Sequence, residues 1–237
     1  MANDYFKFKR FTVHQEHAAF KITTDSVLLG AWAALGGVMH VLDVGTGTGI
    51  LALMAAQRST ARVVAIGPDR NSFMQAGLNI TASPWPDRIT LLNMTLEEYL
   101  RGTPLLYETI ITNPPFFNAS LPNPDVRKAV TRHSITLTHA GLLEASLRLL
   151  IPDGTLQLVL PVNEAKEFAA RAQASGLDCW RRLSVLPTPE LPPARMLMTL
   201  GRQKQDCEES VIVIEKGGRH IYSDEYVSLT KDFYLEF

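Results

Sequence analysis

Short apolar runs alternate with segments of helical period along the first three quarters of the chain. The apolar runs predict strands, at Val38–Val44, Arg62–Ile66, Ile89–Asn93, Tyr107–Thr112 and Thr155–Leu160. The helix-period segments between them are Ile50–Gln57, Ser72–Ile80, Leu96–Leu100, Ala140–Leu150 and Glu164–Ala174, the last with Gly176 as a C-cap. Because strand–helix–strand units cross over with a right hand, this alternation predicts an α/β fold with a doubly wound, mostly parallel sheet.

The alternation of predicted strands and helices ends after Gly176. Three strand-like runs follow without helices between them, at Arg181–Leu186, Arg195–Gly201 and Ser210–Glu215. They predict an antiparallel C-terminal edge on a Rossmann-like sheet of about seven strands, and a last helix begins at Ser223. No linker interrupts the pattern, so residues 1–237 are expected to form a single domain, with 1–37 as an N-terminal extension that contributes cofactor and RNA contacts. The irregular segment 118–139 has the length of a functional lid or binding loop.

Composition narrows the class of protein. With 46% hydrophobic and 20% charged residues, the chain is neither disordered nor fibrous. No stretch of 18 apolar residues and no signal-peptide core is present, so a cytoplasmic protein without membrane contacts is expected. Two distant cysteines, Cys179 and Cys207, and no H-x-x-x-H pair argue against a metal site.

The net charge of −1 restricts any nucleic-acid contact to a local patch. One candidate is at the N-terminus, where cations and aromatic rings are interleaved: Lys7, Lys9, Arg10 and Lys21 with Tyr5, Phe6, Phe8 and Phe11. Such a segment can combine phosphate attraction with base stacking. An amphipathic edge strand with a solvated charged face has the same pattern, so both interpretations stay open.

The stretch "VLDVGTGTGILALMAAQ", residues 41–57, places three alternate glycines between a strand and an apolar helix. Glycines there let a ligand approach the backbone closely, although a tight strand-to-helix turn would also use them. A dinucleotide-binding loop needs its third glycine where Ile50 stands. The D-x-G-x-G-x-G pattern resembles instead the first motif of class I S-adenosylmethionine-dependent methyltransferases. The resemblance implies a set of cofactor-binding residues, namely Asp43, Gly45, Thr46, Gly47 and Gly49.

The stretch "ITNPPFF", residues 111–117, ends a predicted strand with an amide, two prolines and two aromatic rings. Its "NPPF" resembles the signature of methyltransferases that modify planar nitrogens. An exocyclic amine is a poor nucleophile until its hydrogens are held so that electron density returns to nitrogen. The Asn113 side-chain oxygen and the Pro114 carbonyl can accept those hydrogens. Pro115 rigidifies the turn, and Phe116 can stack on an extruded base, which makes Asn113 to Phe116 the predicted catalytic motif.

A third stretch, "FKITTDSVLLGAWA", residues 20–33, predicts a helix capped by Thr24 or Asp25. With the N-terminal "FKFKRFTVHQEHAAFKI", the turn "SPWPDRI" and the C-terminal "YSDEYVSLTKDFYL", it makes the chain similar, nearly end to end, to bacterial tRNA adenine-N6 methyltransferases that modify the adenine next to the anticodon of a valine tRNA. The resemblance implies S-adenosylmethionine as methyl donor, with Thr24, Asp25 and Asn113 at its pocket. It also implies that Arg132 and His133 lie against the RNA.

The predicted RNA-binding set consists of basic positions: Lys7, Lys9, Arg10, Arg127, Lys128, Arg132 and His133. Two other functions stay open. A protein glutamine N5-methyltransferase would use the same NPPF chemistry, and a non-catalytic cofactor- or RNA-binding module would keep the fold without the reaction. The sequence leaves the oligomeric state open between a monomer and a weak dimer.

One departure from the family pattern lies in "VVAIGPDRN", residues 63–71. Related enzymes usually end the second strand with an acid that binds both ribose hydroxyls. Gly67 stands there, and the first carboxylate is Asp69, two residues later. We expect the Gly-Pro turn to fold Asp69 back to the ribose; the alternative is a site that has lost this contact.

Overall fold

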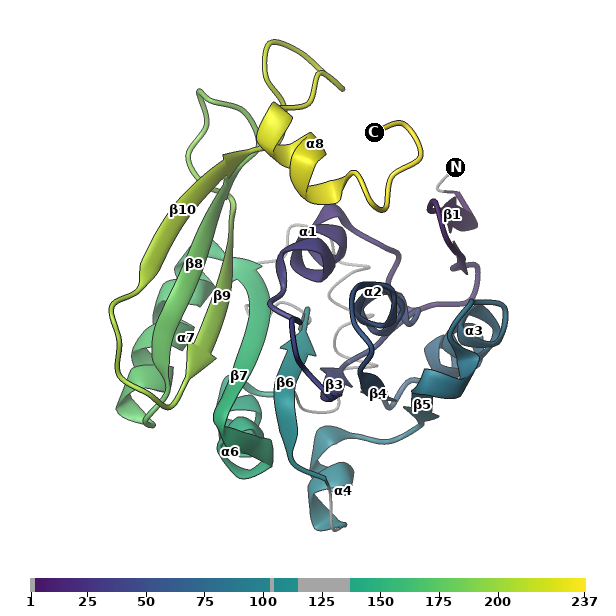
Figure 1. Cartoon of the computed structure of the whole chain (residues 1–237), viewed down its shortest axis with the longest axis vertical. Helices are drawn as coiled ribbons and strands as arrows, with labels where there is room; N and C mark the ends of the chain where they lie inside the picture. The colour runs from purple at the N-terminus through teal and green to yellow at the C-terminus, as the bar shows by residue number, and fades with distance from the viewer. Residues whose placement is uncertain (1–2, 103–104, 115–136) are drawn as a thin grey trace.

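The structure, a computed structural model, describes residues 3–102, 105–114 and 137–237 and is built on an eight-stranded sheet (Figure 1). Across the sheet the strand order is β10-β8-β9-β7-β6-β3-β4-β5. In chain order the strands are β3 (His40–Val44), β4 (Arg62–Ile66), β5 (Ile89–Leu92), β6 (Tyr107–Thr112), β7 (Leu150–Pro161), β8 (Asp178–Leu186), β9 (Arg195–Gly201) and β10 (Glu208–Val213). The five strands from β5 to β7 run parallel, which confirms the predicted doubly wound α/β fold.

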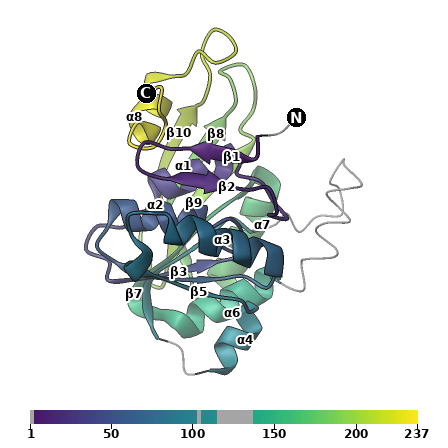
Figure 2. The same cartoon turned by 90° about the vertical axis from the view of Figure 1, so that its right-hand side faces the viewer.

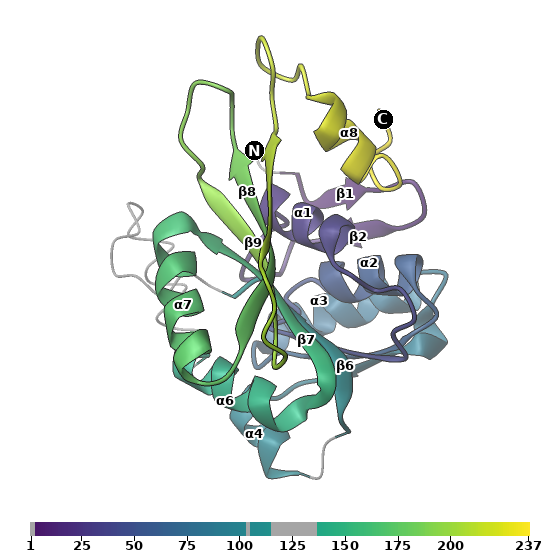
Figure 3. The same cartoon turned by 60° about the vertical axis from the view of Figure 1, so that its left-hand side comes forward.

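Helices cover both faces of this sheet (Figure 3). One face carries α1 (Thr24–Trp32), α2 (Ile50–Arg58), α3 (Arg70–Thr81) and α8 (Asp224–Thr230), and the other carries α4 (Leu96–Arg101), α6 (His139–Leu149) and α7 (Val162–Ala174). Successive residues of a strand point to opposite faces of the sheet. Val41 packs against the helices of the first face and Leu42 against those of the second. None of the described helices is long and apolar enough to cross a membrane.

The C-terminal edge differs from the prediction. The sheet has eight strands, and β10 runs parallel to β8, so only β9 is antiparallel to its neighbours. The reason is that β9 is already paired with β7 on one side and with β8 on the other. A strand that reverses after β9 must therefore add to the free edge of β8, and this gives β10 the direction of β8.

The N-terminal segment forms a separate two-stranded hairpin of β1 (Tyr5–Lys7) and β2 (Thr12–His14) beside α3 (Figure 2). Of the two interpretations that the sequence left open for this segment, base stacking does not hold for Phe8 and Phe11, because these rings are 2% and 6% exposed and belong to the core. Lys9 is also engaged within the fold: its Nζ donates to the carbonyls of Lys231 and Phe237 at 2.6 and 2.5 Å.

Helix α1 corrects a second prediction. The N-cap is Thr23, without a side-chain hydrogen bond, and Thr24 and Asp25 are the first helical residues. Packing replaces capping here, since every residue from Ser26 to Trp32 is buried. Asp25 instead accepts a 2.7 Å hydrogen bond from Arg195 of β9.

Asn79 of α3 joins the hairpin to the glycine-rich loop. This side chain is 1% exposed. Its Nδ2 donates to the carbonyls of His14 and Thr48, both at 2.9 Å, and its Oδ1 accepts from the His14 N–H at 2.9 Å. One buried amide therefore fixes two segments that are distant in the sequence.

We expect Asn79→Ala to lower the free energy of unfolding by about 2–4 kcal/mol, because the buried Thr48 carbonyl and the main-chain N–H and C=O of His14 lose their partner. Urea denaturation followed by circular dichroism measures this change. Leu78→Ala is the matched control on the same helix: Leu78 is 66% exposed, and its removal should cost less than about 0.5 kcal/mol. Equal losses in the two variants would contradict the anchoring role of Asn79.

Candidate active site

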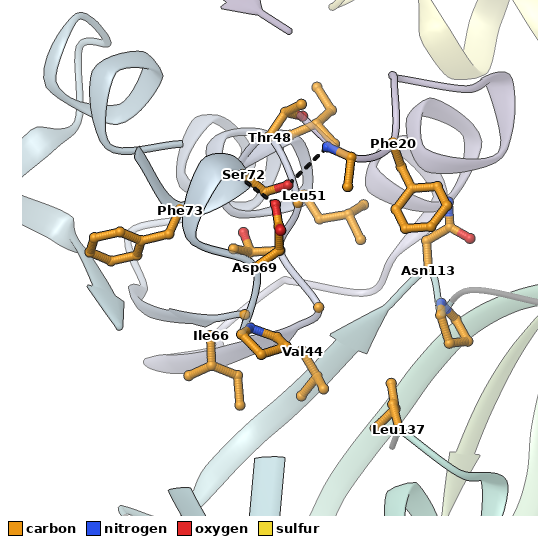
Figure 4. A pocket seen from close by; sticks show the side chains of 18 of the residues that line it. Phe20, Val44, Thr48, Leu51, Ile66, Asp69, Ser72, Phe73, Asn113 and Leu137 are labelled. Carbon is orange, nitrogen blue, oxygen red and sulfur yellow. Dashed lines mark hydrogen bonds between the residues drawn. The ribbon is translucent and has the colours of Figure 1, made fainter. Parts of the chain in front are cut away.

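A cavity of about 420 Å³ lies at the carboxyl ends of β3, β4, β5 and β6 (Figure 4). The chain passes from β3 to β4 and β5 on one side and returns to β6 on the other, so the cavity lies where the strand order reverses. Parallel α/β sheets bind ligands at this point because no strand continues there. The volume is in the range of small-molecule sites.

Asp43 anchors the glycine-rich loop through hydrogen bonds. It is fully buried at the end of β3, and its Oδ2 accepts from the Thr46 hydroxyl at 2.6 Å and from the Ala52 N–H at 3.1 Å. Burial raises the pKa of this carboxyl to about 7, and the two hydrogen bonds lower it in part. Asp43 thus connects the loop to the first turn of α2.

The loop itself presents main chain to the cavity. Gly45 and Gly47 have φ of 75° and 53°, values that favour glycine, and a Cβ on Gly45 would meet no atom within 4 Å. The N–H groups of Gly45 and Thr46 donate to the Ile66 carbonyl at 2.9 and 3.0 Å, which fixes the loop to the end of β4. A ligand can therefore lie directly against a rigid backbone floor.

The departure at the end of β4 has a structural consequence. Gly67 directly follows β4 and is bonded to the end of β5. Its N–H donates to the Leu92 carbonyl, and its own carbonyl accepts from Asn93 Nδ2 at 2.8 Å. The chain then turns, and Asp69 becomes the N-cap of α3, where Oδ1 accepts from the Ser72 N–H at 2.8 Å. Asp69 lines the cavity (Figure 4).

Asn113 lines the cavity from the opposite side of the glycine loop. The Thr112 hydroxyl donates to the Val44 carbonyl at 2.7 Å and so fixes the end of β6 to the end of β3. Asn113 follows, and its Nδ2 donates to Ser26 Oγ at 2.8 Å. Pro114 also lines the cavity. Two further residues of the predicted catalytic motif, Pro115 and Phe116, lie outside the described residues, as do the predicted RNA contacts Arg127, Lys128, Arg132 and His133.

The predicted cofactor residues divide into two groups. Five of them line the cavity: Gly45, Thr46, Gly47, Asp69 and Asn113. The other four, Thr24, Asp25, Asp43 and Gly49, are not among the described residues that line it. Gly49, with φ of 87°, is the N-cap of α2, and Asp25 pairs with Arg195.

Sequence reasoning missed several parts of the wall, among them Ser72 and Phe73 of α3, Leu137, and two longer segments. One is the segment from Ala19 to Thr23 together with Ser26, including the ring of Phe20 on the Asn113 side of Figure 4. Nothing local marks these residues, since a serine in an apolar helix has no distinctive pattern. The other is Met94 to Glu97, which directly follows β5. The rule that sites form at carboxyl strand ends would have indicated that segment.

Comparison with known proteins gives consistent matches. The family model described as "Methyltransferase small domain" matches residues 25–169. The protein named "tRNA1(Val) (adenine(37)-N6)-methyltransferase" from Bacteroides fragilis is 42% identical over 100% of both chains. The protein of the same name from Trichodesmium erythraeum is 41% identical, also over 100% of both. Among solved structures, a predicted O-methyltransferase from Agrobacterium tumefaciens has a TM-score of 0.65 at 16% identity and covers 88% of this chain and 96% of its own, a likeness of fold.

We expect Asp43→Asn to change how stability depends on pH. With a folded-state pKa near 7 and an ordinary value of 3.8, the folded protein holds a proton between those values that the unfolded chain releases. The wild-type free energy of unfolding, relative to that of Asp43→Asn, should therefore fall as pH rises from about 4 to about 7 and stay level above this. Urea titrations at a series of pH values measure the difference, and parallel profiles would contradict it.

Proposed function

Because the chain belongs to the tRNA1(Val) (adenine(37)-N6)-methyltransferase family, we propose that it transfers the methyl group of S-adenosylmethionine to the 6-amino group of adenine 37 in a valine tRNA. The observation that supports this reaction best is the placement of Asn113. It follows β6, lines the cavity and has its amide nitrogen engaged by Ser26. Its amide oxygen is thereby left as an acceptor for an amine.

The cavity suits the methyl donor. The backbone of Gly45 and Gly47 lines it without side chains. Asp69 is an acceptor for the ribose hydroxyls, and Met94 and Leu96 provide apolar surface for the adenine ring. When bound, S-adenosylmethionine supplies a methyl group already activated by its sulfonium sulfur. The protein therefore needs to orient the nucleophile rather than to generate a stronger one.

Asn113 and Pro114 would orient that nucleophile. The amino nitrogen of adenine shares its lone pair with the ring, and this makes it planar and weakly nucleophilic. Acceptance of its two hydrogens by Asn113 Oδ1 and the Pro114 carbonyl favours the geometry in which the lone pair points at the methyl group. The proton becomes acidic once the new N–C bond forms, so water can take it and no strong base is required.

The tRNA is proposed to approach from the side of Asn113, where Phe20 is 41% exposed. Adenine must leave its stack to reach the pocket. The basic residues Lys7, Arg127, Lys128, Arg132 and His133 remain proposed phosphate contacts. Lys9 and Arg10 are less suited to that role, because Lys9 bonds to the C-terminal segment and the Arg10 guanidinium lies 5.1 Å from the Trp85 ring centroid.

The direct test is methylation of unmodified valine tRNA with labelled S-adenosylmethionine, followed by mass spectrometry of the nucleosides. We expect N6-methyladenosine to form in this tRNA and to be absent when guanine replaces adenine 37. A glutamine-containing protein substrate serves as the second arm. Methyl transfer to glutamine, with none to tRNA, would overturn the proposal.

We expect Asn113→Ala to lose about a hundredfold in kcat while cofactor affinity stays within twofold, because the lost acceptor contacts the substrate amine; such a loss corresponds to about 3 kcal/mol. Single-turnover methylation and calorimetric titration of S-adenosylhomocysteine measure the two quantities. Asn71→Ala, which removes the same amide from an exposed position of α3, is the control and should keep full activity. Near-normal turnover in Asn113→Ala would refute the assigned role.

We expect Asp69→Ala to weaken S-adenosylhomocysteine binding about tenfold or more, since a charge-assisted hydrogen bond contributes about 1.5–3 kcal/mol. Asp69→Asn keeps an acceptor for the Ser72 N–H and separates loss of the helix cap from loss of the charge. Gly67→Glu should help little if Asp69 already binds the ribose. Unchanged affinity in Asp69→Ala, with tighter binding in Gly67→Glu, would show that the ribose contact has been lost from this chain.

A further inference from the structure

The hydrogen bond between Asn113 and Ser26 joins the end of β6 to the first turn of α1. The Asn113 Nδ2 donates to Ser26 Oγ at 2.8 Å across 87 residues of sequence. Both residues line the cavity, and Ser26 is only 7% exposed. This bond occurs at the side chain that the proposed reaction needs most.

A carboxamide presents an acceptor on one side and a donor on the other. Rotation of the Asn113 amide by half a turn would replace its oxygen by an NH₂ group in front of the substrate amine. Two donors would then face each other, and the amine would lose the acceptor that orients its lone pair. The reaction therefore depends on which way this amide faces.

Ser26 supplies an acceptor on the α1 side of the amide. In the structure the Ser26 hydroxyl oxygen accepts the Nδ2 hydrogen of Asn113. With Nδ2 engaged in this way, Asn113 Oδ1 is held on the other side of the amide. This hydrogen bond belongs to the orientation in which Asn113 Oδ1 faces away from Ser26.

Helix α1 is a rigid support for this serine. Arg58 Nη1 donates to the carbonyls of Gly30 and Ala33 at 2.9 and 2.7 Å, which holds the last turn. At the first turn, Asp25 accepts from Arg195 Nε at 2.7 Å, which ties the helix to β9. Ser26 lies directly after that ion pair, so its hydroxyl has little freedom to move away from Asn113.

We propose that Ser26 is a positioning residue, which holds the Asn113 amide so that Oδ1 faces the substrate amine. The inference rests on the proposed function, since it concerns the same methyl transfer. It assigns a role in the reaction to a residue of the N-terminal extension that has no direct contact with the amine.

Ser26→Ala is expected to lower kcat about tenfold, the effect of one lost oriented hydrogen bond, with the KM for tRNA and the affinity for S-adenosylhomocysteine within twofold of wild type. Ser26→Thr retains the hydroxyl and should recover most of the rate. The matched control is Ser146→Ala: Ser146 is a fully buried helical serine that donates to the Leu142 carbonyl on the other face of the sheet. That variant should keep wild-type kcat.

A double-mutant cycle distinguishes positioning from a general loss of structure. Once Asn113 is alanine, there is no amide to orient, so Ser26→Ala should cause no further loss in the Asn113→Ala background. An equal tenfold loss in both backgrounds would overturn the inference, as would wild-type kcat in Ser26→Ala. If the wild type methylates valine tRNA and Ser26→Ala keeps the wild-type kcat, only this inference is refuted. If the wild type itself does not methylate valine tRNA, the proposed function and this inference are refuted together.

Discussion

The buried carboxyl of Asp43 is the constraint on which the cavity depends. Its two hydrogen bonds join the middle of the glycine loop to α2, while the Ile66 carbonyl holds the start of the same loop. Burial makes the charged form unfavourable and raises the pKa of this carboxyl to about 7. The same two hydrogen bonds fix the loop before a ligand binds. Ligand binding therefore has to order little backbone, and more of the binding free energy is available to orient the ligand.

The residues before the first sheet strand complete the site. Asn79 fixes the hairpin and the glycine loop through one side chain, and Ser26 of α1 contacts Asn113. Lys9 joins the hairpin to the C-terminal segment. The N-terminal segment therefore supports the cavity, and Lys9, which the sequence suggested for RNA, forms hydrogen bonds within the fold.

The order of the strands places the proposed ribose contact and the proposed catalytic amide on opposite sides of β3. Asp69 follows β4 and Asn113 follows β6, with β3 and its glycine loop between them. Neighbouring strands are about 4.8 Å apart, so the ends of β4 and β6 are separated by about 10 Å. A methyl donor that contacts Asp69 at one end and reaches Asn113 at the other must cross the loop. Under the proposed function, this strand order brings the methyl donor beside its acceptor.

The sequence by itself determined the βαβ series, the glycine loop and the position of Asn113, because each depends on periodicity or spacing within a few residues. Tertiary structure decided the rest. The direction of β10 follows from β9 having no free edge, and Phe8 and Phe11 are buried because other parts of the chain cover them. Asp69 reaches the cavity through a turn and a helix cap, and Ser26 meets Asn113 across 87 residues. Such contacts join residues that no local pattern connects, so only the folded chain reveals them.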